Sequence, residues 1–131
     1  MPHYEDLTPY TYQPERWRRS PVNVGWLAAG HPFPTGPVPE GFVERLARLA
    51  VHHPVNRTRG WQDCELCDAD YPVEIEVDGS REPIGDAEIR VGGGRHRYAA
   101  PTLIVHYVAA HGYRPPDGFI SAVMGDRRVV S

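Results

Sequence analysis

Two cysteines separated by two residues, Cys64 and Cys67, constrain this chain most, because they place two thiols on one tight turn. A histidine pair, His106 and His111, follows much later. A structural zinc ion is held by four nitrogen or sulfur donors at the corners of a tetrahedron. The two pairs supply that donor set, and the His-x4-His spacing lies in the range used by zinc modules. The sequence therefore predicts one zinc ion held by these four residues.

The spacing of the histidines imposes a geometric condition. On an ideal α-helix, side chains five positions apart point about 140° away from each other. Both can reach one ion only if the last turn of the helix is loose, and Gly112, directly after His111, permits loosening. If the helix stays regular, one histidine leaves the metal, and His31, His52 or His53 could replace it.

The cysteine pair has an alternative reading as a redox site. Redox-active pairs of this spacing lie at a helix N-terminus, where the first thiol has a lowered pKa. Here a Gly-Trp loop precedes the pair and a strand pattern follows it. The neighbouring carboxylates of Asp63, Glu65 and Asp68 disfavour a thiolate. Metal binding is therefore the favoured interpretation.

The length of 131 residues predicts a single domain over residues 1–131. Residues 1–38 are rich in proline and aromatic side chains, and each proline disfavours helix in the residue before it. We expect this stretch to be an extended strap that lays its rings, including Trp17, onto the rest of the domain. Within it, only residues 22–27 resemble a strand.

The remaining chain alternates between helix and strand patterns. A helix is predicted over 39–53, because apolar residues recur there at helical spacing and Pro54 ends it. Residues 54–125 are predicted to hold the cysteine knuckle, antiparallel strands and a C-terminal helix. Within that region we expect strands at 71–77, 87–91 and 95–98, and helices at 101–111 and 117–124. The expected fold is α+β: a small antiparallel sheet with two or three helices, a long strap and a zinc knuckle.

Charge and hydropathy exclude some classes of function. The net charge is −3 and the sequence carries no basic stripe, so nucleic-acid binding is not expected. The local cluster of Arg16, Arg18 and Arg19 is interpreted as solvated surface. No apolar run approaches the roughly 20 residues of a membrane span, and the N-terminus does not resemble a signal peptide. We therefore expect a cytoplasmic location.

A second candidate site is a pocket formed by His31, Arg57 and Arg59. His31 stands in a proline-rich turn, and the two arginines could hold an anionic substrate beside it. The plainer interpretation is that the prolines fix a turn around a buried imidazole.

Several motifs resemble a family of small, uncharacterised actinobacterial proteins, over nearly the whole chain. They are GHPFPTG at 30–36, CELC at 64–67 and HYVxxHGYRPP at 106–116, with further similarity at 4–10 and 98–104. The resemblance implies that the cysteines and histidines named above match positions of the shared motif. It implies no activity. Related sequences often carry a histidine where this chain has Gln62.

Two functions of different classes fit these features. The first is a non-catalytic, zinc-stabilised module that binds a partner, expected to be another protein. The second is an enzyme, either a zinc-dependent hydrolase or a small tailoring enzyme, in which one metal position stays open for water. The oligomeric state is not predicted.

Overall fold

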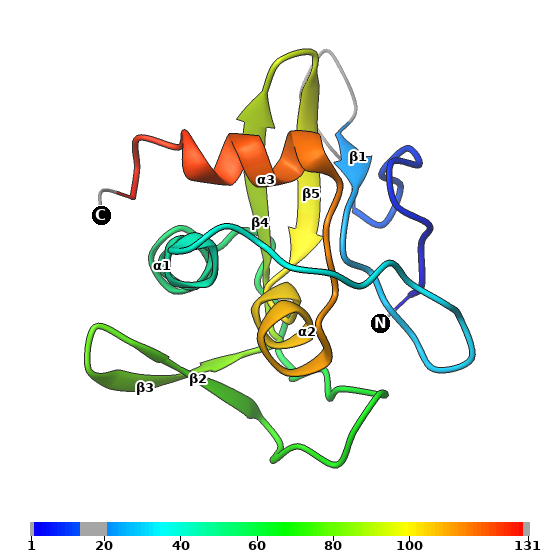
Figure 1. Ribbon diagram of the computed structural model, residues 1–131. Helices are drawn as coiled ribbons and strands as arrows, with labels where there is room; N and C mark the ends of the chain where they lie inside the picture. Colours follow the sequence, from blue (N-terminus) through cyan, green and yellow to red (C-terminus); the bar gives the residue numbers. More distant parts are fainter. Residues whose placement is uncertain (1, 14–20, 130–131) are drawn as a thin grey trace.

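The computed structural model describes residues 2–13 and 21–129, and these form the expected α+β fold with small sheets and three helices (Figure 1). Trp17 and the cluster of Arg16, Arg18 and Arg19 lie outside the described residues. The elements, in chain order, are β1 Val22–Asn23, α1 Phe42–His52, β2 Val73–Val77, β3 Ser80–Ile84, β4 Glu88–Gly93, β5 His96–Pro101, α2 Ile104–His111 and α3 Asp117–Met124.

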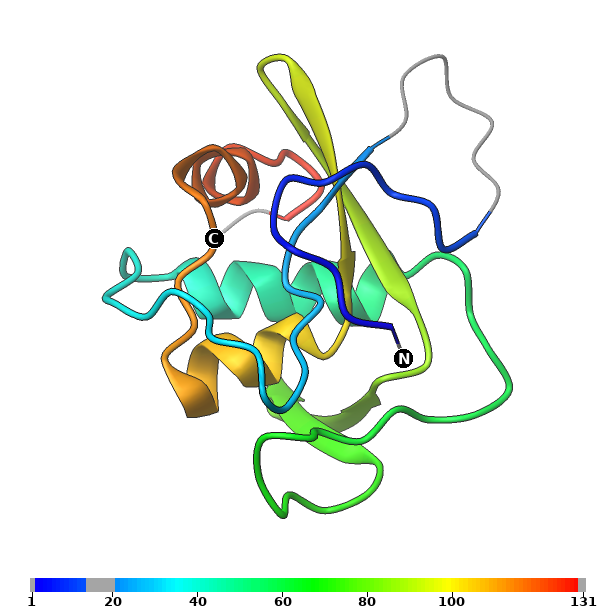
Figure 2. The ribbon, with the colours of Figure 1, turned by 90° about the vertical axis from the view of Figure 1, so that its right-hand side faces the viewer.

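The described strands form two sheets instead of the single antiparallel sheet that was expected. The larger sheet is mixed, with the order β1-β5-β4: β1 runs parallel to β5, and β4 runs antiparallel to it. Helices α1 and α3 both contact β4 and cover one face of this sheet, as Figures 1 and 2 show from two directions. The core lies between this face and the helices.

The second sheet is the hairpin of β2 and β3, which packs against α1 and α2. Asp78 and Gly79 form its two-residue turn with φ of 51° and 84°, the positive values that this kind of hairpin turn needs. Strand β3 was not predicted, because its residues, Ser-Arg-Glu-Pro-Ile, lack an apolar alternation. Pairing with β2, not its own pattern, makes this segment a strand.

The helices are shorter than predicted at their starts, apart from α3, whose bounds match. Helix α1 begins at Phe42 and not at residue 39, because Gly41 before it adopts a left-handed conformation with φ of 85°. Helix α2 begins at Ile104, because Pro101 still belongs to β5. Phe42 is fully buried and anchors α1 in the core.

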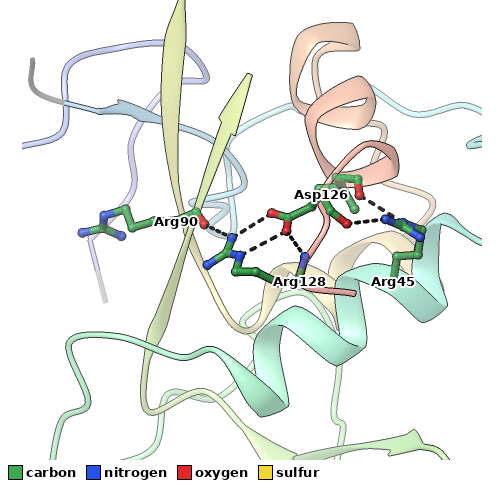
Figure 3. Close-up of polar contacts among 5 residues, drawn as sticks. Arg45, Arg90, Asp126 and Arg128 are labelled. Atoms are coloured by element: carbon green, nitrogen blue, oxygen red, sulfur yellow. Dashed lines mark hydrogen bonds and ion pairs between the residues drawn. The ribbon is translucent and has the colours of Figure 1, made fainter. Parts of the chain in front are cut away.

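A cluster of arginines fixes the end of α3 to the rest of the fold (Figure 3). Arg45 of α1 is buried and donates hydrogen bonds to the carbonyls of Val123 and Asp126, at 3.1 and 2.6 Å. Arg128 donates to the Asp126 carboxylate at 2.8 Å and to the Arg90 carbonyl of β4 at 2.6 Å. The buried guanidinium group of Arg45 thus satisfies carbonyls at the end of α3.

The N-terminal strap folds back on itself along β1. Main-chain hydrogen bonds join Tyr4 to Trp26, Leu7 to Asn23 and Tyr10 to Pro21, at 2.7 to 3.2 Å. The rings of Tyr4, Tyr10 and Tyr12 surround Trp26, which is 1% exposed and donates its indole N–H to the Ala99 carbonyl. In the described residues the expected strap is therefore a folded layer on the edge of the mixed sheet. The described residues contain no helix long and apolar enough to cross a membrane.

Candidate metal centre

The knuckle is a tight turn whose two cysteines differ in exposure. Cys64 is 5% exposed and belongs to the hydrophobic core, whereas Cys67 is exposed. Glu65 lies between them and accepts a hydrogen bond from the Ala29 main chain at 3.3 Å, which ties the knuckle to the strap. The turn therefore has one sulfur anchored in the interior and one at the surface.

The loop before the knuckle is held by the main chain. Gln62 donates to the Gly85 carbonyl at 2.8 Å, and Gly85 donates to the Thr102 hydroxyl at 2.8 Å. A Cβ at Gly85 would stand 2.7 Å from the Gln62 carbonyl oxygen, so only glycine fits this close approach. The loop is in this way fixed beside the start of α2, the helix that carries both histidines.

The last turn of α2 is wider than that of a regular α-helix. Gly112 has φ of 67°, and its N–H bonds to the carbonyl of Tyr107, five residues back, instead of four. Tyr113 donates to the same carbonyl at 3.1 Å. A five-residue hydrogen bond is the π-type pattern, which places more residues in each turn. His106 and His111 reach the same group of donor atoms at this end of the helix, and the wide bond at Gly112 is a loosening of the kind that the sequence required.

The four side chains meet at the end of α2. The Cys64 sulfur lies 3.4 Å from His111 Nε2, and the Cys67 sulfur lies 3.4 Å from His106 Nε2. All four donor atoms fall within 4.8 Å of one another. The two imidazole rings have centroids 5.1 Å apart and planes at 77°, so they approach the centre from different directions. The group is placed to hold a metal ion.

The distances fit a tetrahedral ion. With metal–sulfur bonds of about 2.3 Å and metal–nitrogen bonds of about 2.0 to 2.1 Å, a sulfur–nitrogen edge of the tetrahedron is about 3.5 Å. The two observed separations of 3.4 Å are close to that edge. The remaining separations between donor atoms are all within 4.8 Å.

The electrostatics of the centre also suit a cation. Burial raises the pKa of the Cys64 thiol above its ordinary value, although main-chain N–H groups of Leu66 and Cys67 oppose this. Burial lowers the pKa of His106, and the neighbouring His111 lowers it further. Without metal, Cys64 and His106 are thus favoured in their neutral forms, and a bound cation would supply the charge that turns a thiol into a thiolate ligand. A raised thiol pKa is the opposite of what a redox pair needs.

The remaining candidate residues lie elsewhere. His31 stacks on His3 with ring centroids 3.9 Å apart, and His52 lies 3.8 Å from the Asp78 carboxylate. His31, His52 and His53 are not members of the Cys₂His₂ group. The three alternative histidines are therefore not needed to complete it.

The predicted pocket of His31, Arg57 and Arg59 is not brought together by polar contacts. Arg57 pairs with Asp86 at 3.0 Å. Among the described residues, no hydrogen bond, ion pair or ring contact joins His31 to Arg57 or Arg59. Their joint role stays a prediction. The sequence analysis did not identify His3 and Glu5, whose side chains lie beside His31. The signal that could have indicated them is a histidine and a glutamate two positions apart.

Comparison with known proteins gives a family without a function. A domain of unknown function, DUF7919, matches residues 2–124. The chain belongs to this family. No curated protein and no solved structure matched. The match shows an uncharacterised family over nearly the whole chain, and it assigns no function.

Proposed function

We propose that this chain is a zinc protein in which Cys64, Cys67, His106 and His111 hold one ion in a closed, structural site. The observation that carries the proposal is the convergence of two sulfur and two nitrogen donors at tetrahedral spacing. Thiolates and imidazoles in this geometry favour zinc over magnesium, calcium or manganese, which take oxygen ligands. Four protein donors fill a zinc tetrahedron, whereas a catalytic zinc keeps a position for water.

The ion would join two parts of the chain that lie far apart in the sequence. Its ligands come from the knuckle, which lies in a loop between α1 and β2, and from the far end of α2. Zinc binding would therefore contribute folding free energy directly. Thiolate ligands must stay reduced, so the proposal includes a reducing compartment such as the cytoplasm.

The non-catalytic role that we propose is binding to another protein through a groove beside the metal centre. The groove has a volume of about 290 Å³ and lies between α1, β2 and α2, with His106 in its wall. Val43, Ile75 and Ala109 give it apolar surface, and its other lining residues include three glutamates, Glu44, Glu74 and Glu76. Apolar surface framed by carboxylates is complementary to a basic segment that carries an apolar anchor.

The zinc site is tested by metal analysis of the purified chain. We expect one zinc ion at this group, so that Cys64→Ser and His111→Ala each bind one ion fewer per chain than wild type, whereas His52→Ala, at a histidine outside the group, binds as many as wild type. X-ray absorption should give two sulfur and two nitrogen neighbours. Three protein ligands and one water oxygen would instead support the enzymatic alternative, a hydrolase or tailoring enzyme with an open position. Absence of bound zinc after purification and reconstitution would refute the site.

The interaction is tested by selecting peptides from a random display library on the zinc-loaded chain. We expect enriched peptides to be basic with an apolar residue, and to bind at least tenfold more weakly to the Glu44→Gln, Glu76→Gln double variant. Glu40→Gln, an exposed substitution just before α1, is the matched control. Peptides that bind wild type and double variant equally would contradict the groove, while leaving the zinc site standing.

A further inference from the structure

A second group of metal-ligating side chains lies outside the Cys₂His₂ centre. Donor atoms of His3, Glu5 and His31 fall within 4.8 Å of one another. Two segments supply them, the start of the strap and the proline-rich turn after β1, and both lie near the N-terminus in Figure 1. We propose that these three residues bind a divalent first-row metal ion and leave part of its coordination open.

The hydrogen bonds of His3 prepare it as a ligand. Its Nδ1 lies 2.8 Å from the Trp26 carbonyl oxygen, which can only accept, so Nδ1 carries the hydrogen. In the neutral ring the lone pair is then on Nε2, on the side of Glu5. A backbone carbonyl that fixes the tautomer in this way is the usual outer partner of a metal-binding histidine.

The distance between His3 and Glu5 is longer than a strong hydrogen bond and matches the distance between two ligand atoms of one metal ion. His3 Nε2 and Glu5 Oε1 are 3.5 Å apart. A charge-assisted hydrogen bond is about 2.7 to 2.9 Å long. Nitrogen and oxygen ligands on one metal ion, each at about 2.0 to 2.2 Å, stand roughly 3 to 3.5 Å apart. Two acceptors that face each other across this gap are stabilised by a cation between them.

The backbone holds His3 and Glu5 in place. They are two residues apart in an extended segment, so their side chains leave it on the same side. Tyr4, between them, donates its N–H to the Trp26 carbonyl at 3.2 Å. The Thr8 hydroxyl bonds to the Glu5 carbonyl at 2.7 Å. The two donors therefore need little ordering when an ion arrives.

His31 is the movable member of the group. It is exposed and stands between Gly30 and Pro32, with its N–H directed to the Ala28 carbonyl at 3.4 Å. Its ring stacks on His3 at 3.9 Å with planes at 19°. Stacked rings hold their lone pairs in nearly parallel planes, so His31 must turn about its side-chain bonds to direct a lone pair at an ion that His3 also binds. That rotation gives up one ring contact and no buried packing.

The donor set defines the chemistry of this second site. Two imidazoles and one carboxylate suit Zn²⁺, Co²⁺, Ni²⁺ or Fe²⁺, and they leave at least one coordination position for water or a small oxygen ligand. A cavity of about 140 Å³, with Asp6, Leu27 and Phe33 in its walls, adjoins His3 and Glu5 and gives such a ligand room. The Cys₂His₂ centre would be closed, and this one open.

The test is the number of metal ions per chain, measured on protein that carries no affinity tag. Cobalt(II) is titrated into the metal-free chain, and bound metal is counted after equilibrium dialysis. We expect a second ion in wild type, lost in Glu5→Gln and in His31→Ala, and retained in His96→Ala, an exposed histidine on β5. Glu5 and His31 are both exposed, so neither substitution removes buried packing.

An internal signal shows that the variants stay folded. Cobalt at the Cys₂His₂ centre gives sulfur-to-metal charge-transfer absorption, which an oxygen and nitrogen site lacks. That absorption should be unchanged in Glu5→Gln and His31→Ala. Wild type that saturates at one ion, or variants that still bind the second, would overturn the proposal whatever the outcome at the Cys₂His₂ centre.

Discussion

The Tyr113 hydroxyl donates a hydrogen bond of 2.8 Å to the Asp6 carboxylate. This bond joins the chain just after the C-terminal end of α2, where His111 lies, to the N-terminal strap. The second Asp6 oxygen accepts from the Gly25 main chain at 3.1 Å. Burial raises the pKa of Asp6, and these two hydrogen bonds act against the rise. Tyr113 is fully buried, so the widened turn that precedes it is fixed by an interior contact.

Tyr113→Phe should destabilise the fold by about 1 to 3 kcal/mol, because it leaves a part-buried carboxylate without one of its donors. The measurement is urea unfolding of the metal-loaded chain. Tyr12→Phe is the matched control: this hydroxyl is on a ring that is 36% exposed, and its loss should change stability by less than about 0.5 kcal/mol. Equal stabilities for the two variants would mean that the Asp6 contact contributes nothing.

Gly112→Ala should weaken zinc binding by roughly 5- to 30-fold. A Cβ in the left-handed region costs about 1 to 2 kcal/mol, and the chain can relieve that strain by narrowing the turn that aligns the histidines. Gly94→Ala is a close control, because Gly94 has φ of 57° against 67° for Gly112, and neither Cβ would meet another atom within 4 Å. Competition with a chromophoric chelator measures affinity. A similar loss in both variants would contradict a specific role for the turn.

Asp126→Asn should destabilise the fold by up to about 1.5 to 3 kcal/mol at neutral pH, and less in acid. The hydrogen bond from Arg128 is the main cause that lowers the pKa of Asp126 in the fold. A lowered folded-state pKa gives stability that is present above the unfolded pKa and lost as the pH falls through the folded pKa.

The check for Asp126 is urea unfolding of wild type and variant from pH 7 down past the ordinary aspartate pKa of 3.8. The difference between them should shrink over the acid part of this range. Glu74→Gln removes an exposed pair with Arg81 and should have a smaller effect, below about 1 kcal/mol at any pH. A constant difference for Asp126→Asn would show that packing, not charge, is lost.

Chelation of the metal should loosen the knuckle before the mixed sheet. Hydrogen–deuterium exchange should rise in residues 62–70 and at the end of α2, whereas β4 and β5, which pair over their whole length, should keep their protection. Cys67→Ser with zinc present should reproduce this pattern, since Cys67 is exposed and its loss leaves no core cavity. Uniform exchange throughout the chain would instead show that the metal is needed for the entire fold.

Elements with a strong periodicity were predictable from the sequence. The apolar stripe predicted α1, and Phe42, Leu46 and Leu49 are fully buried. The cysteine and histidine spacings predicted a group that the structure does bring together. The sequence also indicated that the last turn of α2 must loosen, because residues five apart on an ideal helix point in different directions. Gly112, directly after His111, is the residue that permits this.

Features that depend on distant pairing were not predictable. Strand β3 exists because β2 lies beside it, and β1 joins the mixed sheet in parallel because the strap folds across β5. Neither relation leaves a local pattern. His3 and Glu5 meet His31 where Tyr4 is bonded to Trp26 across the fold, so the sequence showed the two-residue spacing of His3 and Glu5 but nothing that joins them to His31.

The distance along the chain between the two halves of the metal centre has a consequence for biosynthesis. Cys67 and His106 are 39 residues apart, and Cys64 and His111 are 47 apart. A ribosome adds about 5 to 20 residues each second, so both thiols emerge roughly 2 to 10 s before their histidine partners. During that interval the nascent chain exposes two unprotected thiols, so the yield of chains able to bind a metal would depend on the redox state at the site of translation.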